Sequence, residues 1–326
     1  MEGAGFAGDG PEPKAEALVY DVVVVGKANV DYLARGPNLP GPGEGVNGDA
    51  FQEACGGKGA NQAVGAARLG ARVALVARIG TDARGEMVLA ALRGEGVDTG
   101  HVSRDPAERT GVALCHVDAR GQKQILSALG ANSRLHAACV RDAADALRSA
   151  RVVLTQLGVP FEAFEEAVRI GRAGGAKIVL DPAPGLPLPD ALLSALDVIR
   201  PNALEAHALT GIRVRDRSSA REAAAQLLRR GAKAAAVQAG SEGDVLLWAG
   251  GECWLPRLDV PRVDVTGAGD AFASTLAVSL AEGKPLDAAG RFASAAAALA
   301  TTALGAQASL PTRAAVNALL EKNRHE

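Results

Sequence analysis

The sequence predicts an α/β protein: a doubly wound, mainly parallel sheet flanked by helices, with a small β-sheet lid. Two observations lead to this prediction. The run Val22–Val25 is β-branched throughout and ends at Gly26, as in a central strand buried on both faces. Residues 57–70 then place small apolar side chains at helical spacing, and residues 72–77 follow as a second buried strand. Strand, helix, strand is the repeating unit of a parallel sheet.

The same alternation of short apolar runs and helical periods continues along the chain. It predicts strands at 152–154, 177–180, 198–199 and 234–237, and helices at 161–172, 202–209, 219–228, 271–281 and 286–302. Two stretches do not fit this alternation of strands and helices. The first is rich in Gly and Pro, and the second alternates apolar and polar residues. We expect them to form lid strands, within about residues 31–53 and 109–127.

Composition limits the partners and the compartment. With 35 Lys plus Arg against 37 Asp plus Glu, the chain has no basic stripe for nucleic acid or an anionic membrane. No apolar run reaches the length of a membrane span, and four widely spaced cysteines indicate reduced thiols, so we expect a cytoplasmic protein. We expect residues 1–16, rich in Gly, Pro and acids, to be a disordered tail before one domain at 17–326.

The segment from Val263 to Asp270 is the most informative for chemistry. Gly267, Ala268 and Gly269 leave backbone N–H groups uncovered where a helix begins, and such amides form an anion hole. A carboxylate beside the hole, here Asp270, is placed to deprotonate a hydroxyl that attacks a phosphoryl group. The structural alternative is an ordinary first-turn acid after a glycine turn.

A second glycine-rich segment lies upstream. Gly56 and Gly57 permit close approach of a ligand to the backbone, while Lys58 and Asn61 supply hydrogen-bond donors for sugar hydroxyls. Taken alone, the segment is also compatible with a plain strand-to-helix turn. A dinucleotide site is disfavoured, because residues 26–29 after the first strand lack the required glycine pattern.

Together the two segments closely resemble the two signatures of the ribokinase-like, or PfkB, family of carbohydrate kinases, and the similarity runs from about Val22 to Pro311. The resemblance implies ATP-dependent phosphorylation of a small sugar, D-ribose to ribose 5-phosphate, with Asp270 as general base. A nucleoside or other sugar kinase of the same family is the first alternative. A non-catalytic sugar-binding protein on a kinase fold is the second.

The resemblance also carries over individual binding residues. It implies sugar contacts from Asn29 and Asp31, and Mg²⁺ binding through water by Glu205 beside Asn202, a pair that equally suits a helix capping box. For the nucleotide it implies the residues Gln238, Gly240, Ser241, Gly243, Gly269 and Ser294. For K⁺ it implies Asp264 with groups of Thr266, Ala300, Ala303, Gly305 and Ser309.

This chain departs from the family pattern at three places, of which the mildest is Ser294, where relatives commonly have Asn or His near the adenine. Gln238-Ala239 replaces the usual Thr-Leu of the nucleotide turn, which removes a side-chain hydroxyl. The sugar-contacting carboxylate of the pattern Gln-Leu-Glu is replaced by Gly158, and this predicts an altered sugar specificity. Because edge strands invite pairing, we also expect a homodimer formed through the lid.

Overall fold

The computed structural model describes residues 20–120, 122–240 and 242–323. The predicted tail at 1–16 therefore lies outside the described residues, as does Ser241. None of the helices within these ranges has both the length and the hydropathy that crossing a membrane requires.

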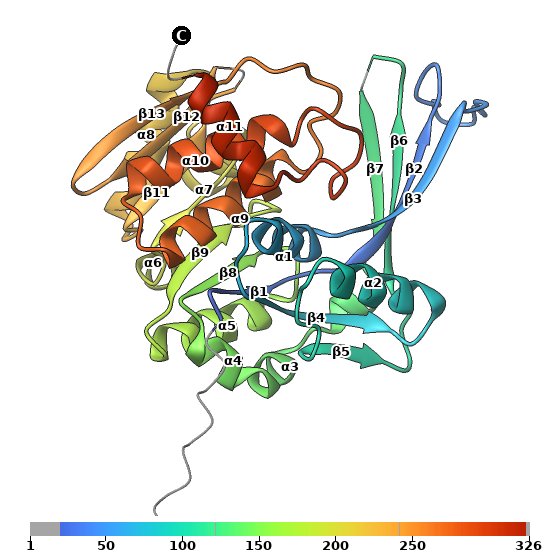
Figure 1. The fold of residues 1–326 in the computed structure, drawn as a ribbon, viewed down its shortest axis with the longest axis horizontal. Coiled ribbons are helices and arrows are strands. Elements are labelled where there is room, and N and C mark those ends of the chain that lie inside the picture. Colours follow the sequence, from blue (N-terminus) through green and yellow to red (C-terminus); the bar gives the residue numbers. More distant parts are fainter. Residues whose placement is uncertain (1–19, 121, 241, 324–326) are drawn as a thin grey trace, which may run out of the picture.

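The main sheet has nine strands in the order β13-β12-β11-β10-β9-β8-β1-β4-β5 (Figure 1). Its strands from β5 to β11 run parallel, and β12 and β13 are added antiparallel at one edge. The strand bounds are β1 Val22–Val25, β4 Val73–Gly80, β5 Val102–Asp105, β8 Val152–Gln156, β9 Lys177–Asp181, β10 Val198–Ile199, β11 Ala234–Gln238, β12 Gly243–Trp248 and β13 Gly251–Pro256. The predicted doubly wound sheet is confirmed.

Helices cover both faces of this sheet and create two hydrophobic cores. The strand β1 divides them, because Val22 and Val24 belong to one core and Val23 and Val25 to the other. The first core is covered by α1 Lys58–Arg68, α2 Ala83–Gly94, α9 Ala268–Ala281, α10 Leu286–Leu299 and α11 Arg313–Lys322. The second is covered by α3 Ala137–Asp142, α4 Ala144–Ser149, α5 Phe161–Ala173, α6 Asp190–Ser194, α7 Ala203–Thr210 and α8 Arg217–Arg229.

A separate four-stranded sheet stands out from the body beside α2 (Figure 1). We call it the lid; its order is β3-β2-β6-β7, with β2 Asn29–Arg35, β3 Ala50–Gly56, β6 Gly111–Val117 and β7 Lys123–Ala128. The strand β2 follows β1 after three residues, so the main sheet passes directly into the lid. Each of the two predicted stretches contributes strands to this sheet.

Several element boundaries differ from the sequence prediction, and two of them lie near the predicted site. The helix α9 begins at Ala268, three residues earlier than predicted, so Asp270 lies in its first turn. The helix α10 ends at Leu299 and not at 302, because Ala300 is its C-cap and Thr301 and Thr302 continue in a turn.

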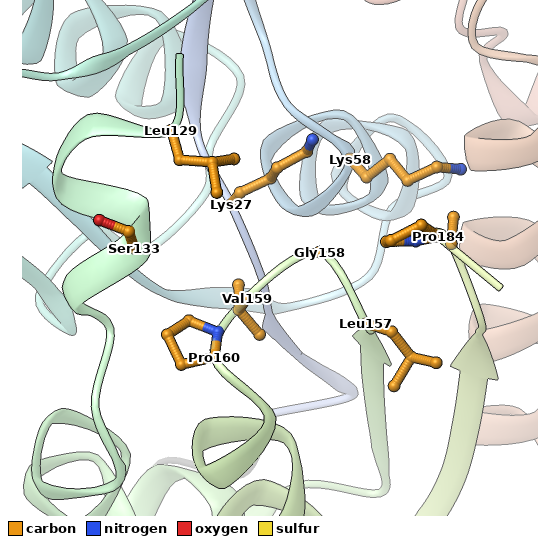
Figure 2. A pocket seen from close by; sticks show the side chains of 10 residues that line it. Lys27, Lys58, Leu129, Ser133, Leu157, Gly158, Val159, Pro160 and Pro184 are labelled. Atoms are coloured by element: carbon orange, nitrogen blue, oxygen red, sulfur yellow. The ribbon is translucent and has the colours of Figure 1, made fainter. Parts of the chain in front are cut away.

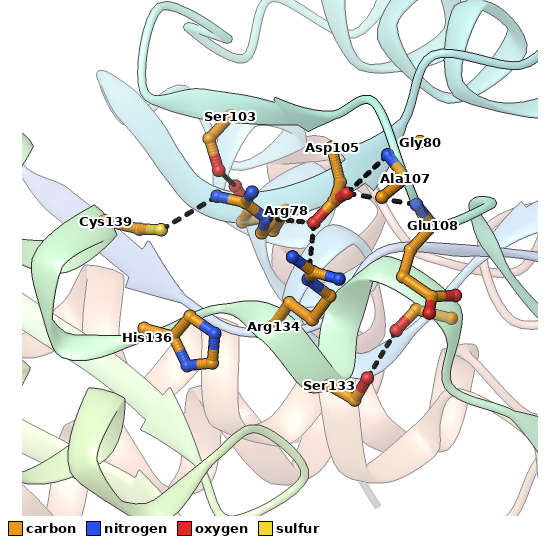
Figure 3. A network of polar contacts seen from close by, with 12 residues as sticks. Arg78, Gly80, Ser103, Asp105, Ala107, Glu108, Ser133, Arg134, His136 and Cys139 are labelled. Carbon is orange, nitrogen blue, oxygen red and sulfur yellow. Dashed lines mark hydrogen bonds and ion pairs between the residues drawn. The ribbon is translucent and has the colours of Figure 1, made fainter.

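The junction between sheet and lid is held by the short 3₁₀ helix η1, Gly130–Arg134 (Figure 3). Arg134 Nε lies 2.9 Å from Asp105 Oδ2, and Arg78 Nε lies 2.8 Å from the same oxygen. Burial would raise the pKa of Asp105, but backbone N–H groups and Arg78 lower it to about 2. From η1, the Asn132 side chain accepts the Ala28 N–H at 2.9 Å and donates to the Ala28 carbonyl at 3.0 Å. The backbone before Asn29 is thereby fixed in position.

Candidate active site

A cleft of about 690 Å³ lies between the lid and the carboxyl ends of the central strands. This is where ligands bind in open α/β sheets. Most residues that the sequence singled out line it, namely Asn29, Asp31, Gly57, Lys58, Asn61, Asn202, Glu205, Gln238, Thr266, Gly267, Ala268, Gly269 and Asp270. The two signature segments, which lie about two hundred residues apart in the chain, meet across this cleft.

The start of α9 forms one wall of the cleft. Gly267 caps the helix with φ 87°, a left-handed conformation that favours glycine, and a Cβ there would approach the Ala306 carbonyl oxygen to 2.9 Å. The amide of Ala268 donates to the Val265 carbonyl at 3.3 Å. The amide of Gly269 has no acceptor within the described ranges. The predicted anion hole therefore offers the Gly269 amide and the positive end of the helix, with the Ala268 amide already engaged.

Asp270 is buried at the base of this wall and is held from three sides. Asn61 Nδ2 donates to Oδ2 at 2.9 Å, Gln62 Nε2 donates to Oδ1 at 3.1 Å, and Lys58 Nζ lies 3.6 Å from Oδ1. Burial raises the pKa of Asp270, and Lys58 opposes that rise. A carboxylate with a raised pKa and a fixed orientation is suited to accept a proton from a hydroxyl.

A second carboxylate, which the sequence analysis missed, shares the same partners. Asp181 Oδ2 accepts from Lys58 Nζ at 2.8 Å and from Gln62 Nε2 at 2.8 Å, and Gln156 Nε2 donates to Gln62 Oε1 at 2.6 Å. Burial would lower the pKa of Lys58, but Asp181 and Asp270 raise it overall, so Lys58 stays charged. Asp181 directly follows the predicted strand at 177–180, and this place at the carboxyl edge of the sheet is the signal that could have identified it.

The two residues predicted to bind the sugar, Asn29 and Asp31, lie at the start of β2, where the chain passes from the main sheet into the lid. Asn29 Nδ2 donates to Asp31 Oδ1 at 2.6 Å. Burial raises the pKa of Asp31 from 3.8 to about 6, although Lys27 and Asn29 oppose the change. A Cβ on Gly56 would lie 2.1 Å from Asp31 Oδ2, and one on Gly57 would lie 2.5 Å from Asn29 Oδ1. The glycines of the upstream signature therefore make room for these two polar side chains.

Only some of the residues that the resemblance implies for nucleotide binding line the main cleft. Asn202 and Glu205 form a capping box at the start of α7, with the Asn202 amide donating to Glu205 Oε2 at 2.9 Å. Both also line the cleft, and burial raises the pKa of Glu205. Gln238, Gly243 and Ser294 line a smaller adjoining cavity, whereas Gly240 lines neither of the two.

Arg200 is a further residue at the anion hole that the sequence analysis missed. Its Nη1 atom lies 3.0 Å from where a Cβ on Gly269 would stand, and Lys58 Nζ lies 3.9 Å from the same point. The guanidinium lies 4.9 Å from the ring centre of Phe272, and its buried Nε has no hydrogen-bond partner in the described part of the chain. Two cations therefore flank the start of α9, a suitable environment for the negative charge of a phosphoryl group.

The loops predicted to bind K⁺ lie against each other behind the anion hole. The Gly305 amide donates to Asp264 Oδ2 at 3.1 Å, and the Thr266 amide donates to Asp264 Oδ1 at 2.9 Å. Burial would raise the pKa of Asp264, but the hydrogen bonds from Thr266 lower it. Ser309 Oγ donates to the Gly305 carbonyl at 2.9 Å, while Ala300 and Ala303 lie on the same connection after α10. An ionised acid among loop carbonyls is a donor set of hard oxygens.

The fold and this cleft define an α/β protein that can hold an anionic phosphoryl group beside a buried carboxylate. The chain belongs to the pfkB family of carbohydrate kinases, whose family model matches residues 20–313. The resemblance inferred from the two signatures is thereby confirmed.

Individual relatives match over nearly their whole length. The chain is 40% identical to the ribokinase of Haemophilus influenzae over 292 residues, which covers 90% of this chain and 95% of that protein. It is 33% identical to the deoxyribokinase of Salmonella typhi over 304 residues, which covers 93% of this chain and 99% of that protein. A solved structure of Arabidopsis thaliana ribokinase complexed with ribose and ATP matches with a TM-score of 0.84 at 33% identity. The match covers 93% of this chain and 99% of that one.

The raised pKa of Asp31 predicts how this residue affects stability. The folded state binds the proton of Asp31 more tightly than the unfolded state, so the residue's contribution to stability falls as pH rises from 3.8 to about 6. Asp31→Asn removes this loss and keeps the acceptor for Asn29. We expect the free energy of unfolding in urea to rise by roughly 1–3 kcal/mol at pH 7.5, and by much less at pH 4.5.

The matched control is Asp145→Asn, which alters a fully exposed acid of α4. Its effect on the free energy of unfolding should be small and similar at both pH values. An Asp31→Asn effect that does not depend on pH would contradict the assignment of a raised pKa.

Proposed function

We propose that this protein transfers the γ-phosphoryl group of ATP to a hydroxyl of a small sugar, converting D-ribose to ribose 5-phosphate. The main support is the placement of Asp270, which is buried at the start of α9 and oriented by Asn61 and Gln62 beside charged Lys58. Relatives named ribokinase and the ATP and ribose complex of one of them support the same pair of substrates.

In this proposal the sugar binds between the lid and α1, with ring hydroxyls at Asn29 and Asp31 and the reacting hydroxyl at Asp270. As the hydroxyl oxygen attacks the γ-phosphorus, Asp270 takes its proton, the bond from phosphorus to the bridging oxygen breaks, and ADP leaves. The Gly269 amide, Lys58 and Arg200 stabilise the negative charge on the transferred group.

Two ions complete the proposal. Glu205 and Asn202 would hold Mg²⁺ through water, because both oxygen-bearing side chains line the cleft beside Arg200 and Gln238. Bound Mg²⁺ neutralises charge on the β- and γ-phosphates. The ionised Asp264 and the carbonyls of Thr266, Ala300, Ala303 and Gly305 would hold K⁺ behind the anion hole, with Ser309 beside them.

We further propose that residues 17–326 act as one kinase domain whose lid covers the sugar. Contact between lid and body supports this, since Lys123 Nζ of β7 donates to Thr266 Oγ1 at 2.6 Å. A nucleoside kinase remains the first alternative, and a non-catalytic sugar-binding protein the second. Against a purely binding role, burying a carboxylate beside two amide donors and a charged lysine requires desolvation that sugar binding alone does not need.

The proposed reaction is tested by coupled measurement of ADP release with ribose, deoxyribose, fructose and nucleosides as acceptors. Ribose should stimulate ADP release, because polar side chains line the cleft. Omitting Mg²⁺ should abolish turnover, and replacing K⁺ by choline should lower it. If ribose and deoxyribose do not stimulate ADP release but nucleosides do, the nucleoside alternative is correct. If neither these acceptors nor any other sugar, neutral or anionic, stimulates ADP release, the kinase proposal is wrong.

The role of Asp270 is tested by Asp270→Asn. The amide keeps the size of the side chain but cannot accept the proton, so kcat should fall by roughly 10²–10⁴. The matched control is Asp287→Asn, which alters an acid in the first turn of the neighbouring helix α10. The activity of this variant should match that of the wild type. A near-normal kcat for Asp270→Asn in a folded protein would remove Asp270 from the role of general base.

The homodimer remains a proposal that rests on the lid surface. The lid exposes large apolar side chains on its two edge strands and beside them, with exposed fractions of 68% for Phe51, 52% for Ile125 and 70% for Leu126. Exposed apolar edge strands are common dimer surfaces. Sedimentation velocity should therefore show a dimer that Leu126→Lys weakens, whereas a monomer at all protein concentrations would contradict the proposal.

A further inference from the structure

A second cavity, of about 580 Å³, adjoins the sugar end of the cleft at the turn after β8. Figure 2 shows Lys27 and Lys58 on one side of this turn at Gly158, with Val159 and Pro160 on the other. Both lysines also line the main cleft, so the cavity borders the site of the proposed acceptor. Apart from the lysines and Ser133, its walls are glycine and apolar residues, namely Leu129, Leu157, Gly158, Val159, Pro160, Ala183 and Pro184.

This cavity stays open because residue 158 has no side chain. A Cβ at Gly158 would meet the Ala183 carbonyl oxygen and the Lys27 Cδ and Cε atoms at 3.6 Å, which is ordinary van der Waals contact. The backbone therefore tolerates a larger residue there. The family pattern, which has Glu at this position, would put a carboxylate beside the Lys27 side chain. This chain lacks that carboxylate, and the space that the glutamate side chain would occupy stays open.

The missing carboxylate leaves Lys27 without a close counter-ion. Its ammonium has no hydrogen bond and no ion pair within 4.0 Å to any residue that the structure describes. Lys58 is different, because it contacts both Asp181 and Asp270. Burial and the charge of Lys58 lower the pKa of Lys27, whereas Asp31 and Asp270 raise it.

An ammonium that is partly desolvated and has no close anion is unfavourable, and an anionic ligand would relieve this cost. The apolar walls around the cavity strengthen such an interaction, because they exclude water from the ion pair. They also provide a surface for a carbon skeleton. Charge and volume at this end of the site thus fit the same ligand, namely a sugar that carries an anionic group.

We propose that the protein also phosphorylates sugars that carry an anionic group, a carboxylate or a phosphate. The anionic group lies beside Lys27, and the part of the sugar that carries it occupies the cavity at Gly158. The inference rests on the proposed phosphoryl transfer. Its chemistry is the same: the acceptor hydroxyl gives its proton to Asp270, a new bond joins its oxygen to the γ-phosphorus, and ADP leaves. What changes is the class of acceptor that this chain admits.

The test compares kcat/KM for matched neutral and anionic acceptors. Ribose 1-phosphate shares its ring and free 5-hydroxyl with ribose, and gluconate pairs with glucose, so the two pairs distinguish a phosphate from a carboxylate. The wild-type protein should turn over at least one anionic acceptor. Lys27→Gln should lower kcat/KM for that acceptor about 10- to 100-fold more than for its neutral partner, as expected for loss of one charge-assisted hydrogen bond.

Gly158→Glu provides a second, independent variant. It fills the cavity and pairs with Lys27, so it should lower kcat/KM for the anionic acceptor and raise it for ribose. Lys27→Arg keeps the charge and should retain the preference for the anionic acceptor. Lys322→Gln, which alters an exposed lysine at the end of α11, is the matched control and should leave the ratio of the two kcat/KM values unchanged.

Two results would overturn the inference and leave the kinase proposal intact. One is turnover of ribose without turnover of ribose 1-phosphate or gluconate. The other is an equal loss for neutral and anionic acceptors in Lys27→Gln. Absence of ADP release with every acceptor, neutral or anionic, is a different result, because it removes the proposed phosphoryl transfer and this inference with it.

Discussion

The site depends on one constraint: Asp270 is a buried carboxylate, and a buried charge is stable only when other groups compensate for its lost hydration. Lys58, Asn61 and Gln62 supply that compensation from a single helix, α1. The same helix also satisfies Asp181, so two acids from distant parts of the chain share one cation and one amide. The arrangement stabilises the charged site and orients the group that we propose as the base.

The topology of the sheet makes this arrangement possible. In a doubly wound parallel sheet the helices that follow the strands begin at the carboxyl edge, so the N-termini of α1, α7 and α9 can meet at one cleft. The glycines at Gly57 and Gly267 then let polar side chains and backbone approach without a Cβ in the way. On the lid side, η1 fixes the backbone at Ala28 through Asn132. Rigid elements thus position every group around the proposed reacting hydroxyl.

Much of this fold could be predicted from the sequence, because buried parallel strands are continuous apolar runs and the helices between them are strongly periodic. The helices α2, α3, α4, α6 and α11 were not predicted. Three of them are short, and α2 and α11 have few buried apolar positions, so the hydrophobic period is weak. Glycine-rich signatures could be recognised for a related reason: they are local, and each consists of consecutive residues.

The residues that were missed are those whose role depends on contacts across the chain. Gln62 lies inside the upstream signature, but its contact with Asp270 spans 208 positions. Asp181 meets Lys58 over 123 positions, so no local pattern marks either contact. Arg200 precedes the capping pair at Asn202 and Glu205 by two and five positions, yet only the folded chain brings it to Gly269. Gly158 was noticed as a missing carboxylate, whereas its consequence for Lys27 required the packing of two loops.

The most direct test of the account is a crystal structure of the protein with ribose, Mg²⁺, ADP and aluminium fluoride, which imitates the transferred phosphoryl group. The expected result is aluminium fluoride at the start of α9, bonded to the Gly269 amide, Lys58 and Arg200, with an Asp270 oxygen within about 3 Å of the ribose 5-hydroxyl. Aluminium fluoride bound away from α9, or a 5-hydroxyl out of reach of Asp270, would contradict it.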